Sequence, residues 1–458
     1  MIIMDNMEKF FSPDSIAVIG ASRKTGKVGN SVVKNLKDSF DGKVYPVNPK
    51  ADRVAGLRCY DSIEDIEETP ESAVIAVPAK IANMVMEQCV ELGVPAVTML
   101  TSGYGETGEE GEKLQEELEE IIEGSDTRMI GPNCLGIWDS SSGMDSMFLP
   151  GYKMEEPEKG NIAVISQSGA VGSALLDLAA DQKIGVSKFV SYGNQLDVSE
   201  TDLLEYLGQD ENTDAVAVYM EGVKDGQEFL EKAGKVTEDT PVVILKAGKT
   251  EEGSEAAVSH TGSMAGNYQV YQGAFRQKGI IEAVNTRQLF DYAKTLAKEE
   301  KPGGDRVAVV TNGGGFGVLA TDAVSETGLE LAEFSEETRE KLEDVVKDYG
   351  NVSNPLDLVG DAEPELYQRS LDILSEASEV DMVLCISLVT LAPIDPSINE
   401  IIEDVHRNSE KPVVGCMMGG SYTKMHTDYL EEKGVPMFRR PEDGVKALEA
   451  LRKYHDIK

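Results

Sequence analysis

Three segments of this chain share one pattern, in which a short apolar strand leads into a turn of small residues and then into a helical stretch. They begin with SIAVIG (Ser15–Gly20), NIAVIS (Asn161–Ser166) and RVAVVT (Arg306–Thr311). Further β-rich runs alternate with helical stretches of about 10–15 residues after each of them. This alternation predicts βαβ units, and therefore an α/β fold built on parallel sheets.

The pattern restarts after two segments rich in Pro, Gly and charge, a composition typical of linkers. They are PGYKMEEPEKG (Pro150–Gly160) and KEEKPGGD (Lys298–Asp305). The 458 residues therefore divide into three α/β blocks of about 150 residues, a common domain size. We expect one domain over residues 1–148, a second over 149–300 and a third over 301–458.

The composition excludes several classes of partner. A formal net charge of −39 repels nucleic acid and anionic membranes. No apolar run approaches the roughly 20 residues that span a bilayer, and the N-terminus lacks a signal-peptide pattern. Five widely spaced cysteines without a CxxC pair argue against a disulfide scaffold or a metal site and fit a cytoplasmic protein. The acidity fits either a salty host or ordinary surface charge.

In so acidic a chain, backbone amides and local lysines must hold any phosphate-bearing ligand. Parallel sheets bind ligands beyond the carboxyl ends of their strands, where helix N-termini attract anions. The first turn, GASRKTGKVG (Gly20–Gly29), lacks the GxGxxG spacing of dinucleotide sites. Lys50 stands near the end of the next strand, where an NAD site has an acid. A phosphate-rich nucleotide other than NAD is favoured, with an unliganded tight turn as the alternative.

Four further segments follow predicted strands. They are VPA (Val77–Ala79), GPNCLG (Gly131–Gly136), SQSGA (Ser166–Ala170) and TNGGGFG (Thr311–Gly317). Cys134 is either placed beside a ligand or a small buried packing residue. The hydroxyls of SQSGA suit a phosphate, but they also suit an ordinary helix N-cap. The consecutive glycines of TNGGGFG indicate either a close backbone approach or a ligand cradle.

The segment GSEAAVSHTGSMAG (Gly253–Gly266) consists of small residues without a helical apolar stripe. It contains His260, one of only four histidines in the chain. Neutral imidazole is a good nucleophile near pH 7 and can carry a group covalently. From composition alone, a solvated or packing histidine is the alternative. We assign no role to His406, His426 or His455.

In this order, the motifs resemble the α subunits of ADP-forming acyl-CoA synthetases. The resemblance includes VYPVNPK, AVPAK, HTGSMAG, TNGGGFGVLATDA and NPLDLVGDA, and it covers nearly the whole chain. These enzymes are also called ADP-forming acetate–CoA ligases and are relatives of succinyl-CoA synthetase. The resemblance implies a Rossmann-like CoA-binding domain followed by two flavodoxin-like domains. It also implies an ATP-grasp β subunit as partner, an α2β2 assembly, and Mg²⁺ bound with ADP or ATP mainly on that partner.

The resemblance also implies roles for individual residues. His260 matches the phosphorylated histidine, and Glu221 matches the acid that hydrogen-bonds its ring. The turn that holds the phosphate matches Ser166, Gln167, Ser168 and Gly169. The positions that match the coenzyme A site are Gly20, Ser22, Lys27, Val28, Gly29, Asn48, Pro49, Lys50, Val77, Pro78, Ala79, Asn133 and Cys134.

The implied reaction converts acyl-CoA, ADP and phosphate into free acid, CoA and ATP, with acetyl-CoA as the expected thioester. Phosphate attacks the thioester, and the resulting acyl phosphate passes its phosphoryl group to His260 and then to ADP. Two other interpretations stay open. One is a CoA-binding regulatory or acyltransferase-linked protein without this relay. The other is an NAD-dependent oxidoreductase, which the Gly20 turn and Lys50 disfavour.

Overall fold

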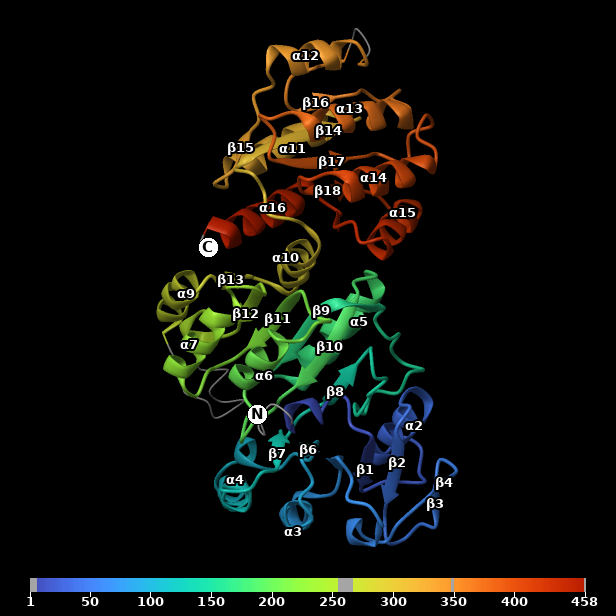
Figure 1. The fold of residues 1–458 in the computed structure, drawn as a ribbon, viewed down its shortest axis with the longest axis vertical. Coiled ribbons are helices and arrows are strands. Elements are labelled where there is room, and N and C mark those ends of the chain that lie inside the picture. Colours follow the sequence, from blue (N-terminus) through green and yellow to red (C-terminus); the bar gives the residue numbers. More distant parts are fainter. Residues whose placement is uncertain (1–5, 254–266, 347–349, 457–458) are drawn as a thin grey trace. The chain divides into compact units, whose positions relative to one another are not determined.

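The computed structural model describes residues 6–253, 267–346 and 350–456. Their contacts form two compact units (Figure 1). The first contains the chain through Asp181 together with Gly185–Glu282, and the second contains Gln182–Ile184 and Ala283–Lys458. The sheets are largely parallel and are covered by helices, which confirms the predicted α/β class. None of the helices described is both long and apolar enough to cross a membrane.

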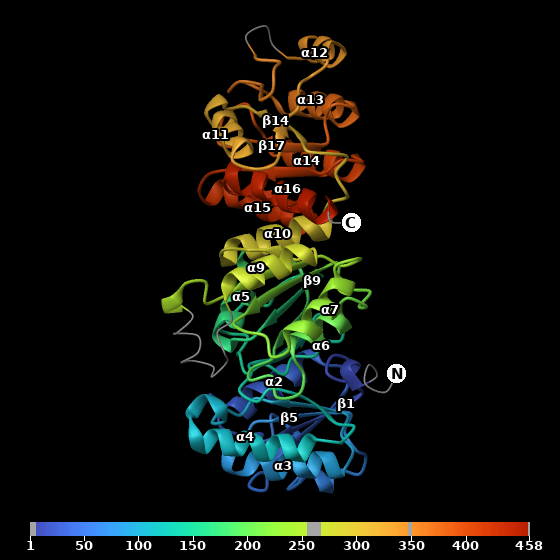
Figure 2. The ribbon, with the colours of Figure 1, turned by 90° about the vertical axis from the view of Figure 1, so that its left-hand side faces the viewer.

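The first unit opens with a sheet of five parallel strands in the order β2-β1-β5-β6-β7. The strands are β1 (Ser15–Ile19), β2 (Lys43–Val47), β5 (Ser72–Ile75), β6 (Ala96–Met99) and β7 (Arg128–Ile130). Its helices are α2 (Val28–Ser39), α3 (Ala79–Glu91) and α4 (Glu109–Ile122), and a small hairpin joins β3 (Arg53–Val54) to β4 (Leu57–Arg58). Figure 2 shows α3 and α4 together on one side of this sheet, where they share one apolar core.

The same unit contains a second sheet, of six strands in the order β13-β12-β11-β9-β10-β8. Its strands are β8 (Gly136–Asp139), β9 (Lys159–Ser166), β10 (Val186–Ser191), β11 (Ala215–Met220), β12 (Val242–Lys246) and β13 (Ile281–Glu282). Its helices are α5 (Gly169–Asp181), α6 (Glu200–Leu207), α7 (Gly226–Val236) and α9 (Tyr268–Gln277). Strand β8 pairs antiparallel with β10, so the chain enters this sheet before the linker at Pro150–Gly160.

The second unit contains the third sheet, in which β15-β14-β17-β18-β19 lie in this order and β16 also pairs with β14. Its strands are β14 (Arg306–Thr311), β15 (Glu330–Leu331), β16 (Leu356–Asp357), β17 (Met382–Ile386), β18 (Val413–Cys416) and β19 (Met437–Phe438). Its helices are α10 (Thr286–Lys298), α11 (Gly314–Ser325), α12 (Glu336–Glu343), α13 (Pro364–Glu376), α14 (Ser397–Asn408), α15 (Ser421–Glu432) and α16 (Pro441–Asp456).

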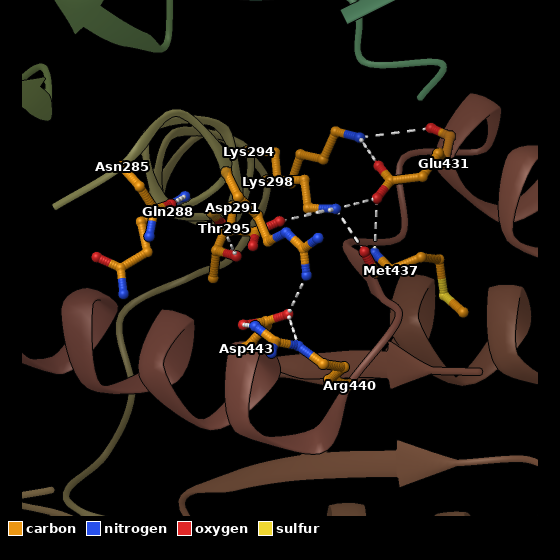
Figure 3. A network of polar contacts seen from close by, with 11 residues as sticks. Asn285, Gln288, Asp291, Lys294, Thr295, Lys298, Glu431, Met437, Arg440 and Asp443 are labelled. Atoms are coloured by element: carbon orange, nitrogen blue, oxygen red, sulfur yellow. Dashed lines mark hydrogen bonds and ion pairs between the residues drawn. The ribbon is translucent and has the colours of Figure 1, made fainter. Parts of the chain in front are cut away.

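Helix α10 precedes the 300/301 boundary expected from the sequence, yet its contacts lie in the second unit. A buried polar network attaches it there (Figure 3). Lys294 donates to the carboxylate of Glu431, and Lys298 lies 3.3 Å from that same carboxylate. Near the start of the helix, Arg287 pairs with Asp443 at 3.2 Å. Because a buried charge without its partner is costly, this network holds α10 against the third sheet's helices.

Candidate functional site

Each of the three sheets has a switch point, where the chain runs from one central strand to neighbours on both of its sides. In the first sheet β1 lies between β2 and β5, and in the second β9 lies between β10 and β11. In the third sheet β14 lies between β15 and β17. Crevices at such switch points, beyond the carboxyl ends of the strands, are where open α/β sheets bind ligands. The three turns singled out in the sequence therefore follow the three strands best placed to bind a ligand.

The first turn brings helix α2 unusually close to the sheet. Gly20 has a φ of +96°, and a Cβ there would lie 2.4 Å from the carbonyl oxygen of Ala76. A Cβ on Gly29 would lie 2.1 Å from the carbonyl oxygen of Gly20. Only glycine fits at either position, so these residues place the start of α2 at the first switch point. Val77 lies at the same point, with its Cγ1 about 3.0 Å from that hypothetical Gly20 Cβ.

Cations surround this turn. Arg23, Lys24 and Lys27 are exposed within it, as is Lys50 beyond β2. The guanidinium of Arg23 donates to the carbonyl oxygen of Lys50 at 3.2 Å, which joins the two segments. Asn48 fixes the backbone between them, since its Nδ2 donates to the carbonyl oxygen of Ala21 at 2.6 Å. This local cluster fits the phosphates of coenzyme A despite the negative charge of the whole chain.

Five more of the predicted coenzyme A positions lie in the same segments around the first switch point: Ser22, Val28, Pro49, Pro78 and Ala79. Val28 begins α2, and Pro78 is the N-cap of α3. The structure therefore gathers most of the predicted coenzyme A residues at one end of the first sheet.

A cavity of about 1030 Å³ lies at the next switch point, where segments of the first and second sheets meet. Six of the predicted residues line it: Asn133, Cys134, Gln167, Ser168, Gly169 and Glu221. The Gly20 turn, Ser166 and Val77–Ala79 do not line this cavity. The predicted thiol end of the coenzyme A site and the predicted phosphate turn thus face one common space.

Within the phosphate turn, two of the predicted residues shape the backbone. The hydroxyl of Ser166 is fully buried and donates to the carbonyl oxygen of Ser168 at 2.7 Å. The side-chain oxygen of Gln167 accepts from the backbone N–H groups of Glu221 at 2.7 Å and Gly222 at 3.1 Å. Ser168 and Gly169 therefore remain as the polar wall at the start of α5, where free N–H groups favour an anion.

Glu221 is anchored where β11 ends. Its carboxylate accepts from the hydroxyl of Tyr219 at 3.3 Å, and its carbonyl oxygen accepts from Lys246 at 2.8 Å. The residue is 7% exposed and lines the cavity. A carboxylate that lines such a cavity can orient the ring of a histidine. His260 itself lies outside the described residues.

Cys134 is a buried residue at the wall of the cavity. It is 4% exposed, its thiol donates to the carbonyl oxygen of Met99 at 3.3 Å, and burial raises its pKa to about 12. The thiol therefore stays protonated, and the residue both packs in the core and lines the cavity. The neighbouring Asn133 has a φ of +59°, and its Nδ2 donates to Asn194 at 3.2 Å.

Sequence reasoning missed several polar residues of the cavity, among them Glu106, Asn194, Gln195 and Lys224. Burial opposes the charge of Glu106, but hydrogen bonds from Asn194 and from three backbone N–H groups lower its pKa. No known motif marks these loops. The available signal was their position, because Asn194 and Lys224 follow strands β10 and β11 at the same sheet edge.

Close packing accounts for two glycines of the third turn. A Cβ on Gly313 would lie 2.3 Å from Leu388, and one on Gly314 would lie 2.6 Å from the carboxylate of Asp357. Gly315 has open space beside it. In the described ranges, no group of three or more acidic, histidine or cysteine side chains could hold a metal ion.

Three known protein families match successive parts of the chain. Residues 14–139 match the family described as CoA binding domain. Residues 159–296 match the succinyl-CoA ligase like flavodoxin domain, and residues 307–455 match the Ligase-CoA domain. These matches agree with a CoA-binding domain followed by two ligase domains.

The chain is 41% identical over 451 residues to the α subunit of ADP-forming acetate–CoA ligase II of Pyrococcus furiosus, covering 97% of both chains. It is 42% identical to ADP-forming acetate–CoA ligase I of Archaeoglobus fulgidus, but it spans only 64% of that protein. A solved structure of dinucleotide-forming acetyl-coenzyme A synthetase 1 from Candidatus Korarchaeum cryptofilum, in complex with phosphate and ADP, superimposes with a TM-score of 0.92. It is 35% identical, and the match covers 98% of this chain and 97% of that one.

Proposed function

This chain belongs to the family of the α subunits of ADP-forming acetate–CoA ligases, and we propose that it converts acyl-CoA, ADP and phosphate into acid, CoA and ATP. Acetyl-CoA is the thioester we propose. The observation that carries the proposal is the shared cavity, which Asn133 and Cys134 line from the coenzyme A side and Ser168, Gly169 and Glu221 from the phosphate side. A thioester and a phosphate can meet in such a space.

In this mechanism the phosphate attacks the thioester carbonyl, CoA leaves, and the acyl phosphate gives its phosphoryl group to His260. Glu221 would hold one ring nitrogen protonated and leave the other as the nucleophile. The backbone N–H groups that begin α5 at Gly169 would stabilise the transferred charge, and one such donor is typically worth about 3 kcal/mol. Phosphohistidine would then deliver the group to ADP.

The proposal includes a partner. Relatives in Pyrococcus furiosus are named α subunits, which supports a β subunit as partner. We propose an ATP-grasp β subunit that binds the nucleotide with Mg²⁺, and an α2β2 assembly. Five unpaired, buried cysteines support a cytoplasmic location. The division at residues 148/149 and 300/301 into three domains also remains part of the proposal.

The test is ATP formation by this chain purified with its β subunit and supplied with acetyl-CoA, ADP, Mg²⁺ and phosphate. We expect ATP that depends on phosphate, and a loss of about 100-fold or more in kcat for Glu221→Gln, because the histidine would lose its orienting carboxylate. Glu87→Gln, an exposed change on α3 outside the cavity, is the matched control and should retain the rate.

A complex that binds acetyl-CoA but forms no ATP would contradict the proposal. That outcome would favour a CoA-binding regulatory or acyltransferase-linked protein.

A further inference from the structure

Gln195 belongs to the lining of the cavity and has an unpaired polar atom in its side chain. The residue is 4% exposed, and its side-chain oxygen Oε1 is buried without a hydrogen-bond partner. Leaving a buried acceptor unpaired costs about 1–3 kcal/mol, so folded proteins seldom do so without a reason. The same residue has a φ of +55°, a left-handed conformation that is uncommon outside glycine.

The surroundings hold this residue in place. Its carbonyl oxygen accepts from the ammonium group of Lys224, and its N–H donates to the carbonyl oxygen of Tyr192 at 3.3 Å. On either side, Asn194 and Leu196 donate backbone N–H groups to Pro132 and Gly131 at 3.0 and 3.1 Å. Backbone strain that is fixed by so many contacts is typical of functional sites.

The chemistry of the pair indicates its ligand. Lys224 faces the cavity as a cation, and burial lowers its pKa because the charged form is deprived of water. An anion beside Lys224 would restore that solvation. Oε1 of Gln195 can only accept a hydrogen bond, so its ligand must also present a donor. A carboxylate and sulfate are anions without a donor at neutral pH, whereas monoprotonated phosphate is an anion that carries one P–O–H group.

The carboxylates of the cavity further restrict which anion can bind there. Glu106, Glu112 and Glu221 also line the space. The carboxylate of Glu106 already accepts hydrogen bonds from within the protein, from Gly103 N–H at 2.6 Å and from Asn194 Nδ2 at 2.7 Å. Negative charge around the cavity disfavours every anion, so an anion that can pair with both Lys224 and the orphan acceptor is selected.

We propose that Gln195 is a phosphate-selecting residue, whose side-chain oxygen accepts the P–O–H proton of monoprotonated phosphate while Lys224 neutralises the anion. This inference rests on the proposed function, in which phosphate attacks the thioester. One unprotonated phosphate oxygen forms the new C–O bond as the C–S bond breaks, and the proton held at Gln195 leaves with the CoA sulfur as a thiol. Acyl phosphate and CoA thiol are the products, so atoms and charge balance.

The test compares phosphate with sulfate, which has the same shape but lacks the proton. In the complex with the β subunit, the phosphate KM and the inhibition constant of sulfate are measured for the wild type, Gln195→Met and Gln195→Gly. Glycine suits the left-handed backbone, so this variant keeps the loop even if the methionine variant folds poorly. We expect the KM for phosphate to rise about 10-fold or more in both variants, because a hydrogen bond to a charged group is lost. Sulfate inhibition should change less than about twofold, since no such bond is lost.

Gln209→Met is the matched control, because Gln209 is exposed and lies outside the cavity. Equal changes for phosphate and sulfate, or no change for either, would overturn the assignment of Gln195. Equilibrium dialysis of labelled phosphate against the full chain, with sulfate as competitor, gives the same comparison without turnover. If the wild type selects phosphate in dialysis and the glycine variant does not, the assignment stands even where ATP formation, and with it the proposed function, fails.

Discussion

Asp145 is a carboxyl group that the fold keeps away from water. It is 4% exposed, and burial raises its pKa to about 8, although the N–H of Met147 donates to it at 2.9 Å. Since its pKa in the unfolded chain is about 3.9, the folded state binds more protons than the unfolded state between these two values. The contribution of Asp145 to stability therefore falls as the pH rises through this range.

We predict that Asp145→Asn gains stability over the wild type by up to about 1.4 kcal/mol per pH unit between roughly pH 5 and 8, and no further above pH 8. Trp138, the single tryptophan, forms a β-bridge with residue 145, so its fluorescence reports unfolding at this point. The measurement is urea unfolding of both proteins at each pH. Parallel stability curves would contradict the raised pKa.

Among the individual residues of the candidate site, the sequence predicted some and missed others for identifiable reasons. The cavity contains Glu221 and the Ser168–Gly169 turn, as the family motifs indicated. The same motifs did not reveal that Ser166 and Gln167 turn their side chains into the protein. Gln195 was not predicted, because neither its left-handed backbone nor its unpaired oxygen has a signature in the sequence.

Among the elements, the strand–turn–helix openings were the most predictable. The runs at Ser15, Ile162 and Val307 are strands β1, β9 and β14, because short, continuous apolar runs are typical of strands buried in a parallel sheet. Strand β8 was not predicted. Its four residues, GIWD, take strand conformation through antiparallel pairing with β10, a partner distant in sequence.

Helix α2 depends on a close contact that tests the first turn. We predict that Gly29→Ala destabilises the protein by about 1–3 kcal/mol or more, because its Cβ would collide with the backbone of Gly20, which cannot move aside. The matched control is Gly315→Ala, likewise at the second residue of a helix, where no atom lies within 4 Å. That change should raise the free energy of unfolding by about 0.4–1 kcal/mol.

Thermal unfolding followed by circular dichroism checks both variants. Because Gly29 also places the start of α2, we expect Gly29→Ala to weaken coenzyme A binding as well. Equal stabilities for the two variants would show that the turn does not pack as closely as described.

Across the whole molecule, negative charge is the dominant property. With a net charge of −39, the chain repels itself, and salt screens this repulsion over distances that shrink from about 10 Å at 0.1 M to about 3 Å at 1 M. We predict that the melting temperature rises as KCl increases from 0.05 to 1 M. The double variant Glu116→Gln, Glu120→Gln, on the exposed face of α4, should show a smaller rise. A melting temperature that is flat or falls with KCl would contradict this prediction.

The local cations at Arg23, Lys24, Lys27 and Lys50 explain how so acidic a chain can still bind a phosphate-rich ligand. These cations lie beside the start of α2, so their local positive field opposes the negative field of the whole chain. Switch points are where open α/β sheets bind ligands, and the proposed coenzyme A and phosphate sites lie at two of them. The phosphorelay remains the central proposal.

The most direct test of that proposal is phosphoryl labelling of this chain. The chain is incubated with its β subunit, Mg²⁺ and γ-labelled ATP, and the separated subunits are examined for acid-labile, alkali-stable label beside His260→Ala. The account predicts label on the wild-type chain and none on the variant. An unlabelled wild-type chain in a complex that binds both the β subunit and CoA, or equal label on both proteins, would contradict it.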